Sequence, residues 1–141
     1  MTIDHATTIV HAVDKLNAGD VDGYIAGLYT PGCRFHGFPD AFTPDRDGIA
    51  EFFRTLIAAV PDTRITAQDL LVDGDRVAIR FTLTGTHRGE LFGVAGTGRS
   101  LDVEGITVLH FVDGLVTERW NRLDDVALLT QLGALPAAAS A

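Results

Sequence analysis

The chain has 141 residues, which is enough for one domain and too few for two ordinary ones. Because 46% of the residues are hydrophobic and 21% are charged, we expect a globular protein, neither disordered nor fibrous. The net charge of −8 argues against nucleic acid as a partner and, more weakly, against anionic membranes, since phosphate groups bind basic surfaces.

Three further features bear on the cellular location. The single cysteine, Cys33, has no partner for an internal disulfide, so a reducing compartment is expected and a buried structural thiol is favoured over a nucleophile. The N-terminal stretch MTIDHATTIV lacks the basic start and the long apolar core of a signal peptide. No apolar run approaches the roughly 20 residues of a membrane span. These patterns predict a cytoplasmic protein that does not enter a membrane.

The first part of the chain has the spacing of helices. Residues 6–18 carry apolar side chains at helical intervals, and a shorter helix is expected over residues 21–29, behind the capping residue Asp20. Residues 33–38 have the composition of a short strand. A third helix follows and ends before Pro61. Its apolar stripe requires a packing partner and consists of Ile49, Phe52, Phe53, Leu56 and Val60.

After Pro61 the apolar period changes from helix to strand. Two strands flank the turn signal Asp73-Gly74-Asp75, and a glycine-rich loop over residues 86–100 separates them from two further strands. A closing helix covers residues 125–132. This order predicts an α+β fold, a cone-shaped barrel in which a strongly curved, mostly antiparallel sheet wraps around the N-terminal helices. We expect one domain over residues 1–133 and a frayed tail over residues 134–141.

The last hairpin carries the first two candidate catalytic residues, His110 and Asp124. A three-residue loop at residues 112–114 would pair Phe111 with Leu115, His110 with Val116, and Val108 with Glu118. That register places His110, Trp120, Arg122 and Asp124 on one face, with Thr107, Leu109 and Phe111 pointing outward as an unusually apolar surface. A two-residue Asp-Gly turn would instead put His110 and Asp124 on opposite faces.

Structural roles compete with catalytic ones for these residues. Asp124 is also a good N-cap for the closing helix, although Asp125 can serve instead. His110 also fits a hydrogen-bonded core histidine. His36 fits a strand-end residue bonded to a loop carbonyl, and His87 is expected to be exposed or to line a pocket mouth. The five histidines show no metal-ligand spacing, so no metal site is expected.

The run from Gly85 to Gly133, together with the motifs CRFHGFP and RDGIAEFF, resembles the SnoaL-like polyketide cyclases of the nuclear-transport-factor-2-like superfamily. The resemblance covers roughly residues 5–133 and implies a helix-capped cone that forms a homodimer or larger homo-oligomer. It also implies an acid/base aspartate after the last strand, matched by Asp124, and a histidine on the preceding strand, matched by His110. The substrate-binding positions that match are His36, Val108 and Arg122.

The resemblance and the residues together predict an acid/base enzyme that needs no cofactor and acts on a hydrophobic, polyketide-like small molecule. The reaction expected is an intramolecular aldol cyclisation or an isomerisation. The expected pocket walls are Phe35, Phe52, Phe81, Phe92 and Trp120. One alternative is a binding module without catalysis on the same cone. Another is an epoxide-hydrolase-like enzyme that uses Asp124 and Arg80, although Thr82 stands where the second aspartate is needed.

Overall fold

The computed structural model describes residues 4–135 and begins with two helices, α1 (His5–Asn17) and α2 (Val21–Leu28). A third helix, α3 (Arg46–Ala59), follows the first strand. The three begin in the same way: the carboxylates of Asp4, Asp20 and Asp45 accept a hydrogen bond from the backbone N–H three residues later. This capping satisfies a donor that the helix itself leaves free, and the sequence marks it with an aspartate each time.

Five strands form one sheet: β1 (Tyr29–His36), β2 (Arg64–Asp73), β3 (Arg76–Thr86), β4 (Ser100–Val112) and β5 (Leu115–Leu123). Their order is β1-β5-β4-β3-β2. Only β1 runs parallel to its neighbour, so the sheet is mixed and mostly antiparallel, as predicted. It is open, with β1 and β2 as its edges in the described chain. A short helix, α4 (Asp125–Leu132), follows β5 and completes the predicted α+β fold.

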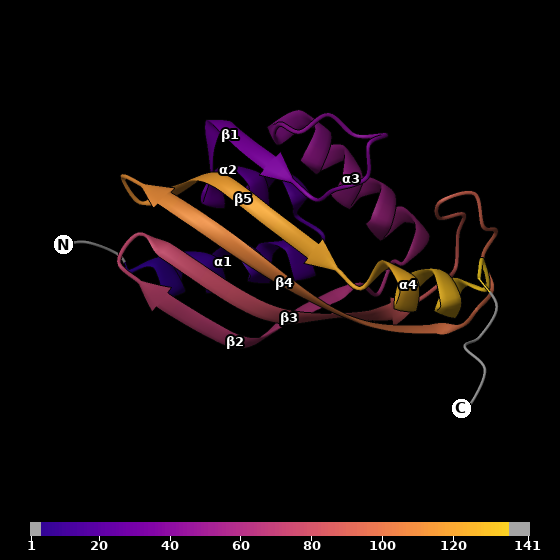
Figure 1. Ribbon diagram of the computed structural model, residues 1–141. Helices are drawn as coiled ribbons and strands as arrows, with labels where there is room; N and C mark the ends of the chain where they lie inside the picture. The colour runs from indigo at the N-terminus through magenta and orange to yellow at the C-terminus, as the bar shows by residue number, and fades with distance from the viewer. Residues whose placement is uncertain (1–3, 136–141) are drawn as a thin grey trace.

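The sheet has two unlike faces. Helices α1 and α2 lie behind it in Figure 1, and α3 crosses beside β1, whereas no helix of the described chain covers the face turned toward the viewer. We call the helix-covered side the inner face and the other the outer face. The predicted apolar stripe of α3 is buried, with Ile49 fully enclosed. The core therefore lies between the inner face and the helices.

The hairpin of β4 and β5 corrects the predicted register. Val112 pairs with Leu115 across a two-residue turn, and the register then shifts so that His110 pairs with Glu118. The shift leaves Thr117 as an extra residue on β5, a bulge that restores the face alternation. The predicted partners of Phe111, His110 and Val108 were therefore wrong. The prediction that His110 and Trp120 share a face is confirmed, with ring centroids 4.5 Å apart.

That shared face is the outer one, which overturns the predicted direction of β4. Thr107, Leu109 and Phe111 were expected to point outward, yet they are only 4%, 1% and 2% exposed. The helices pack on the side of these residues, so alternation leaves Ile106, Val108 and His110 on the opposite side. The predicted sticky outer patch of Thr107, Leu109 and Phe111 therefore does not exist.

The ends of the chain add two findings. Within residues 4–135 no helix has both the length and the apolar character needed to cross a bilayer. The segment predicted to fray, residues 134–141, falls mostly beyond the described residues, which end at Leu135.

Candidate functional site

A pocket of about 70 Å³ lies between the inner face and the helices. Its walls are mainly apolar. The helices contribute Ile9, Val13, Leu16, Tyr24, Leu28, Phe52 and Phe53. The strands contribute mainly inward-facing residues of β3, β4 and β5, which are Ile79, Phe81, Leu83, Thr107, Leu109, Arg119, Asn121 and Leu123.

The guanidinium of Arg119 is the centre of the polar part of this pocket. Its Nε donates to Thr107 Oγ1 at 2.8 Å, and its Nη1 donates to the hydroxyls of Tyr24 at 2.9 Å and Tyr29 at 2.5 Å. Its Nη2 donates to Asn121 Oδ1 at 3.0 Å. These four bonds leave one of the five N–H groups of the guanidinium without an acceptor among the described residues.

Arg119 is a buried charge with neutral partners. It is 8% exposed, and each of its four acceptors is a hydroxyl or an amide oxygen. Burial lowers the pKa of Arg119, but Tyr29 and Tyr24 outweigh it and the pKa is raised, so the side chain stays charged. The ring of Phe38 lies 5.2 Å from the guanidinium carbon and adds a cation–π contact. A buried cation of this kind favours an anionic ligand.

Tyr29 stands beside Arg119 as a neutral phenol. Burial raises the pKa of its hydroxyl well above the ordinary value of 10.0, although the neighbouring Arg119 acts in the opposite direction. The Tyr29 and Tyr24 hydroxyls lie 2.6 Å apart. The pair therefore presents hydroxyl groups next to the guanidinium without adding a negative charge.

The pocket widens into a mouth of about 310 Å³ near α4. Pocket and mouth share Phe38, Phe52, Leu83, Asn121 and Leu123, so the two lie directly beside each other. The mouth adds Phe92 from the loop after β3 and Leu128 and Leu129 from α4. It also adds Asp125, the only carboxylate among the residues that line either part within the described chain.

The structure divides the predicted wall residues between three environments. Phe52 and Phe81 line the pocket, and Phe52 and Phe92 line the mouth. Phe35 is buried in the core with its ring 4.8 Å from that of Tyr29, and it lines neither the pocket nor the mouth. Trp120 lies on the outer face. A role in substrate binding stays a prediction for all five.

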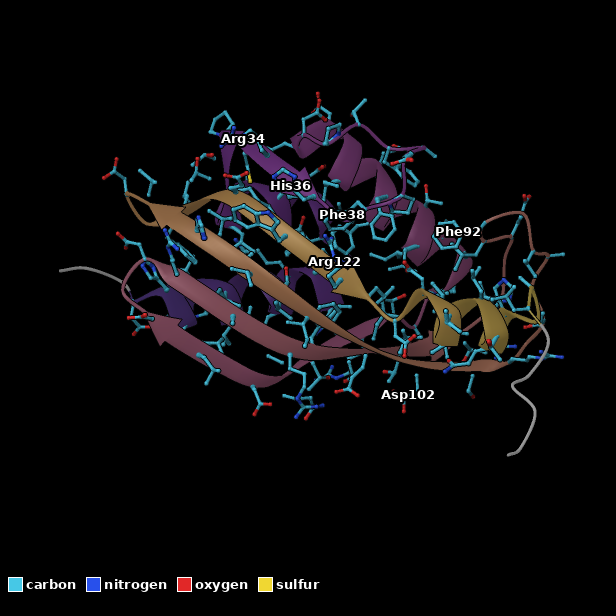
Figure 2. The ribbon with its side chains drawn as sticks, in the orientation of Figure 1. Arg34, His36, Phe38, Phe92, Asp102 and Arg122 are labelled. Atoms are coloured by element: carbon cyan, nitrogen blue, oxygen red, sulfur yellow. The ribbon has the colours of Figure 1, made fainter. Side chains whose placement is uncertain are left out.

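His36, Glu118 and Trp120 form a cluster on the outer face. His36 Nε2 lies 2.6 Å from a carboxylate oxygen of Glu118, and not against a loop carbonyl as predicted. The His36 ring also stacks on Trp120 at 5.2 Å. Arg34 donates to the other Glu118 oxygen at 2.9 Å. Figure 2 shows Arg34 and His36 near each other on β1. Val108, His110 and Arg122 share this face, so none of these residues lines the pocket.

Asp124 caps α4, which is the structural role weighed for it. Its carboxylate accepts from the Ala127 backbone N–H at 3.0 Å. The side chain lines an open outer-face hollow together with Glu104 and Arg122. Catalysis of an intramolecular aldol cyclisation by Asp124 and His110 stays a prediction, but neither residue lines the apolar pocket. Asp125, the alternative cap, lines the mouth instead.

His87 and Cys33 are both buried. His87 is 0% exposed, so the prediction that it is exposed or lines the mouth was wrong. Its Nδ1 accepts from the Thr97 backbone N–H at 3.3 Å, and its Nε2 has no partner among the described residues. Cys33 is buried as predicted, and burial raises the pKa of its thiol to about 12, which makes it a poor nucleophile.

Two further predictions concern ligands and hydrolysis. Among residues 4–135 no group of three or more His, Cys, Asp or Glu side chains is arranged to hold a metal ion. Arg80 binds Asp69 and Glu104 on the outer face, each at 2.7 Å. It does not meet Asp124 in the pocket, so the geometry offers no support for the epoxide-hydrolase alternative.

Sequence reasoning missed the polar residues of the pocket, above all Arg119 and Asn121. A signal was present: on β5 they are two residues apart and so share a face, and Thr107 shares that face on β4. A charged residue at an inward position is unusual unless it is paired or functional. Recognising this signal required knowing which face of β5 points toward the helices. The bulge at Thr117 changes the register of the hairpin, so that direction could not be read from the sequence alone.

Comparison with known proteins places this geometry in a family. A model of the SnoaL-like polyketide cyclases matches residues 7–132. The aklanonic acid methyl ester cyclase AcmA of Streptomyces galilaeus is 42% identical over 59 residues, a segment that spans 42% of this chain and only 41% of that protein.

Two solved structures match over nearly their whole length. AclR, a proposed hydroxylase of Streptomyces galilaeus, has a TM-score of 0.83 at 29% identity, covering 94% of this chain and 97% of that one. IdmH, a proposed polyketide cyclase of Streptomyces antibioticus, has a TM-score of 0.79 at 31% identity, covering 93% and 99%. These matches confirm the expected fold and support the expectation of an enzyme. The chain belongs to the SnoaL-like polyketide cyclase family.

Proposed function

We propose that the protein is a cyclase-type enzyme that binds a hydrophobic, polyketide-like molecule in the inner pocket and stabilises an oxyanion of it with Arg119. The observation that carries the proposal is a buried guanidinium in an apolar pocket whose partners among residues 4–135 are all neutral. A ligand that brings its own negative charge supplies the missing counter-charge. The family membership supports the cyclase class.

The reaction proposed is an intramolecular aldol cyclisation. A proton leaves the carbon next to a carbonyl group, and its electron pair moves to the carbonyl oxygen to give an enolate. The enolate carbon attacks a second carbonyl of the same molecule, which forms the ring bond, and the second oxygen takes up a proton. Arg119 and Tyr29 donate to the enolate oxygen, where charge develops before the bond forms. If the same enolate is reprotonated elsewhere, the outcome is an isomerisation.

Asp125 is the proposed proton acceptor. It is the only carboxylate that lines the pocket or its mouth within the described chain. Because Asp124 caps α4, the side chain of Asp125 has no capping role and is available to the mouth. These steps use side chains alone and call for no cofactor.

A mass measurement after incubation tests the class of reaction. We suggest aklanonic acid methyl ester as the probe, since the relative AcmA bears its name. Cyclisation or isomerisation changes the retention time without changing the mass. A gain of one oxygen would indicate hydroxylation, a gain of one water would indicate hydrolysis, and binding without conversion would indicate the non-catalytic module. Any of these three results would contradict the cyclase proposal.

Arg119→Met tests the role of the guanidinium. Methionine keeps most of the apolar stem and removes the donors, so we expect turnover to fall about 10²–10³-fold, the usual loss for an oxyanion donor. Arg122→Met on the outer face is the matched control and should keep most of the rate. Equal rates for both variants would show that Arg119 does not act on the substrate.

We also propose a homodimer formed through the outer face. The register aligns an apolar and aromatic row across all five strands: Leu71, Ala78, Val108, Trp120 and His36. Beside it runs a row of charged and titratable residues: Asp73, Arg76, His110, Glu118 and Arg34. Leu71, on the edge strand β2, is a large apolar side chain that is 68% exposed.

The two rows are self-complementary about a twofold axis parallel to β4. That axis brings β2 of one copy over β1 of the other, so Asp73 faces Arg34 and Arg76 faces Glu118. Within the apolar row the small Ala78 faces the large Trp120. An isologous contact of this kind closes as a dimer.

A cytoplasmic location stays a prediction, supported by the free thiol of Cys33.

A further inference from the structure

The loop between β3 and β4 holds a phenylalanine in an unfavourable backbone conformation. Leu91 and Val94 exchange backbone hydrogen bonds, each 2.9 Å long, around a two-residue turn. The central residues Phe92 and Gly93 have φ of 50° and 79°. Turns of this kind favour Asn-Gly or Asp-Gly, because both central residues need positive φ.

A second turn in the same chain shows the difference. The β4–β5 hairpin uses Asp113-Gly114, with φ of 51° and 86°, so the favoured residue occupies the first position there. Asp113 tolerates this conformation better than a bulky side chain does. Phe92 carries the strain without an evident gain in packing, since it is 41% exposed. Such strain is frequently kept at ligand clamps.

The base of the loop fixes where Phe92 lies. Backbone N–H groups of Arg88 and Gly89 donate to the Ala59 carbonyl at the end of α3, at 2.8 and 2.9 Å. The His87 imidazole is bonded to Thr97 on the returning arm, and Leu91 is 1% exposed. The turn is thus held over the pocket mouth, and Figure 2 shows Phe92 between α3 and α4.

We propose that Phe92 is a clamp residue that closes on the apolar end of a bound ligand and selects ligands long enough to reach from Arg119 to the mouth. The ring lines the mouth together with Leu128 and Leu129 of α4, so a ligand in the mouth buries the exposed part of the phenyl group. The inference rests on the proposed function, because it takes the inner pocket to be the ligand site.

Phe92→Asn separates a clamp from a packing role. Asparagine adopts positive φ readily, so we expect the melting temperature to stay the same or rise by up to about 4 °C. The neutral probe N-phenyl-1-naphthylamine should bind about 5–10-fold more weakly, with most of the change in the dissociation rate. Asp113→Asn is the matched control: it changes the same position of the other turn and should leave probe binding unaltered.

Each result decides the matter. Unchanged affinity in Phe92→Asn would overturn the clamp while leaving the proposed function intact. A clearly lower melting temperature, with or without weaker binding, would show that Phe92 serves packing and would also overturn it. The anionic probe 8-anilinonaphthalene-1-sulfonate tests the underlying site. Arg119→Met should weaken the binding of this probe and leave the binding of the neutral probe unchanged. If the wild-type protein binds neither probe, the proposed function itself fails.

Discussion

Arg119 and Asn121 point side by side into the pocket from the same strand, with Arg119 Nη2 donating to Asn121 Oδ1 at 3.0 Å. The amide accepts this bond without a negative charge, and it is 7% exposed. An aspartate at this position would have nearly the same shape and would neutralise the guanidinium. The net charge of the Arg119–Asn121 pair therefore depends on one side-chain atom, which is a nitrogen in asparagine and an oxygen in aspartate.

Asn121→Asp is expected to convert the cationic pocket into a neutral one. The new carboxylate should form a buried ion pair with Arg119, which removes the preference for anions. We expect the affinity for 8-anilinonaphthalene-1-sulfonate to fall at least about 10-fold, while that for N-phenyl-1-naphthylamine stays within about 2-fold. Fluorescence titration measures both. Parallel losses for the two probes would mean that the substitution deformed the pocket, and unchanged binding of the anionic probe would show that Arg119 does not bind it.

Asp124 and Asp125 are neighbours with different predicted roles. If Asp125 is the proton acceptor, Asp125→Asn should lower turnover about 10²–10⁴-fold. Asp124→Asn should keep both the cap and the rate, because asparagine is also a preferred N-cap. If instead Asp124→Asn loses the activity and Asp125→Asn keeps it, the original assignment of Asp124 as the acid/base is right and the pocket-based one is wrong.

A third variant tests the structural role of Asp124 as a helix cap, separately from any role in catalysis. Asp124→Ala removes the bond to the Ala127 N–H, and we expect the free energy of unfolding to fall by about 1 kcal/mol. Chemical denaturation measures it, with Asp124→Asn as the reference that retains a capping side chain. Equal stability for the alanine and asparagine variants would contradict the capping role.

The N-terminal helices show what the sequence predicts well. Each begins behind an aspartate cap, and the stripe of α3 has one apolar direction only, so start and buried side follow from local chemistry. Strand β1 was harder to predict. It begins at Tyr29, four residues before the expected start at Cys33, and it passes through Pro31. A proline is tolerated there because β1 is an edge strand, which the chain pattern alone does not reveal.

The inward direction of β4 was not predictable from its own residues. Ile106 and Val108 on one side are as apolar as Leu109 and Phe111 on the other, so alternation identifies two faces without saying which meets the helices. Composition misled further: His110 and Trp120 were predicted to belong to the site, whereas Arg119 was not among the predicted site residues. Only the packing of α1, α2 and α3 decides between the two faces.

Val108→Glu tests the outer-face dimer. Val108 lies at the centre of the apolar row, where a twofold axis along β4 would bring the two copies of the new carboxylate together. We expect the dimer seen by light scattering to become a monomer at micromolar concentration, with an unchanged circular dichroism spectrum. Val126→Glu on α4 is the matched control, since Val126 is 68% exposed and lies off the sheet. A wild-type protein that is monomeric at high micromolar concentration would contradict the dimer.

Glu118 gives a prediction about acid stability. Its bond from His36, then the charge of Arg34, lowers the pKa of the Glu118 carboxyl below its ordinary value of 4.5. A carboxyl with a lowered pKa in the folded state adds stability above the unfolded-state pKa and loses it as the pH falls through the folded-state value. We therefore expect the wild type to have a higher melting temperature than Glu118→Gln at neutral pH. This difference in melting temperature should narrow below about pH 4.5 and vanish in stronger acid.

Glu51→Gln is the control for this experiment, because Glu51 is exposed on α3 and its ion pair with Arg54 is long, at 3.7 Å. Its melting temperature should follow that of the wild type at every pH. The comparison is made at a protein concentration at which light scattering finds the same assembly for all three proteins, since Glu118 also belongs to the proposed dimer face. A constant difference in melting temperature between the wild type and Glu118→Gln down to strong acid would show that the loss is one of packing, and that the charge of Glu118 does not stabilise the fold.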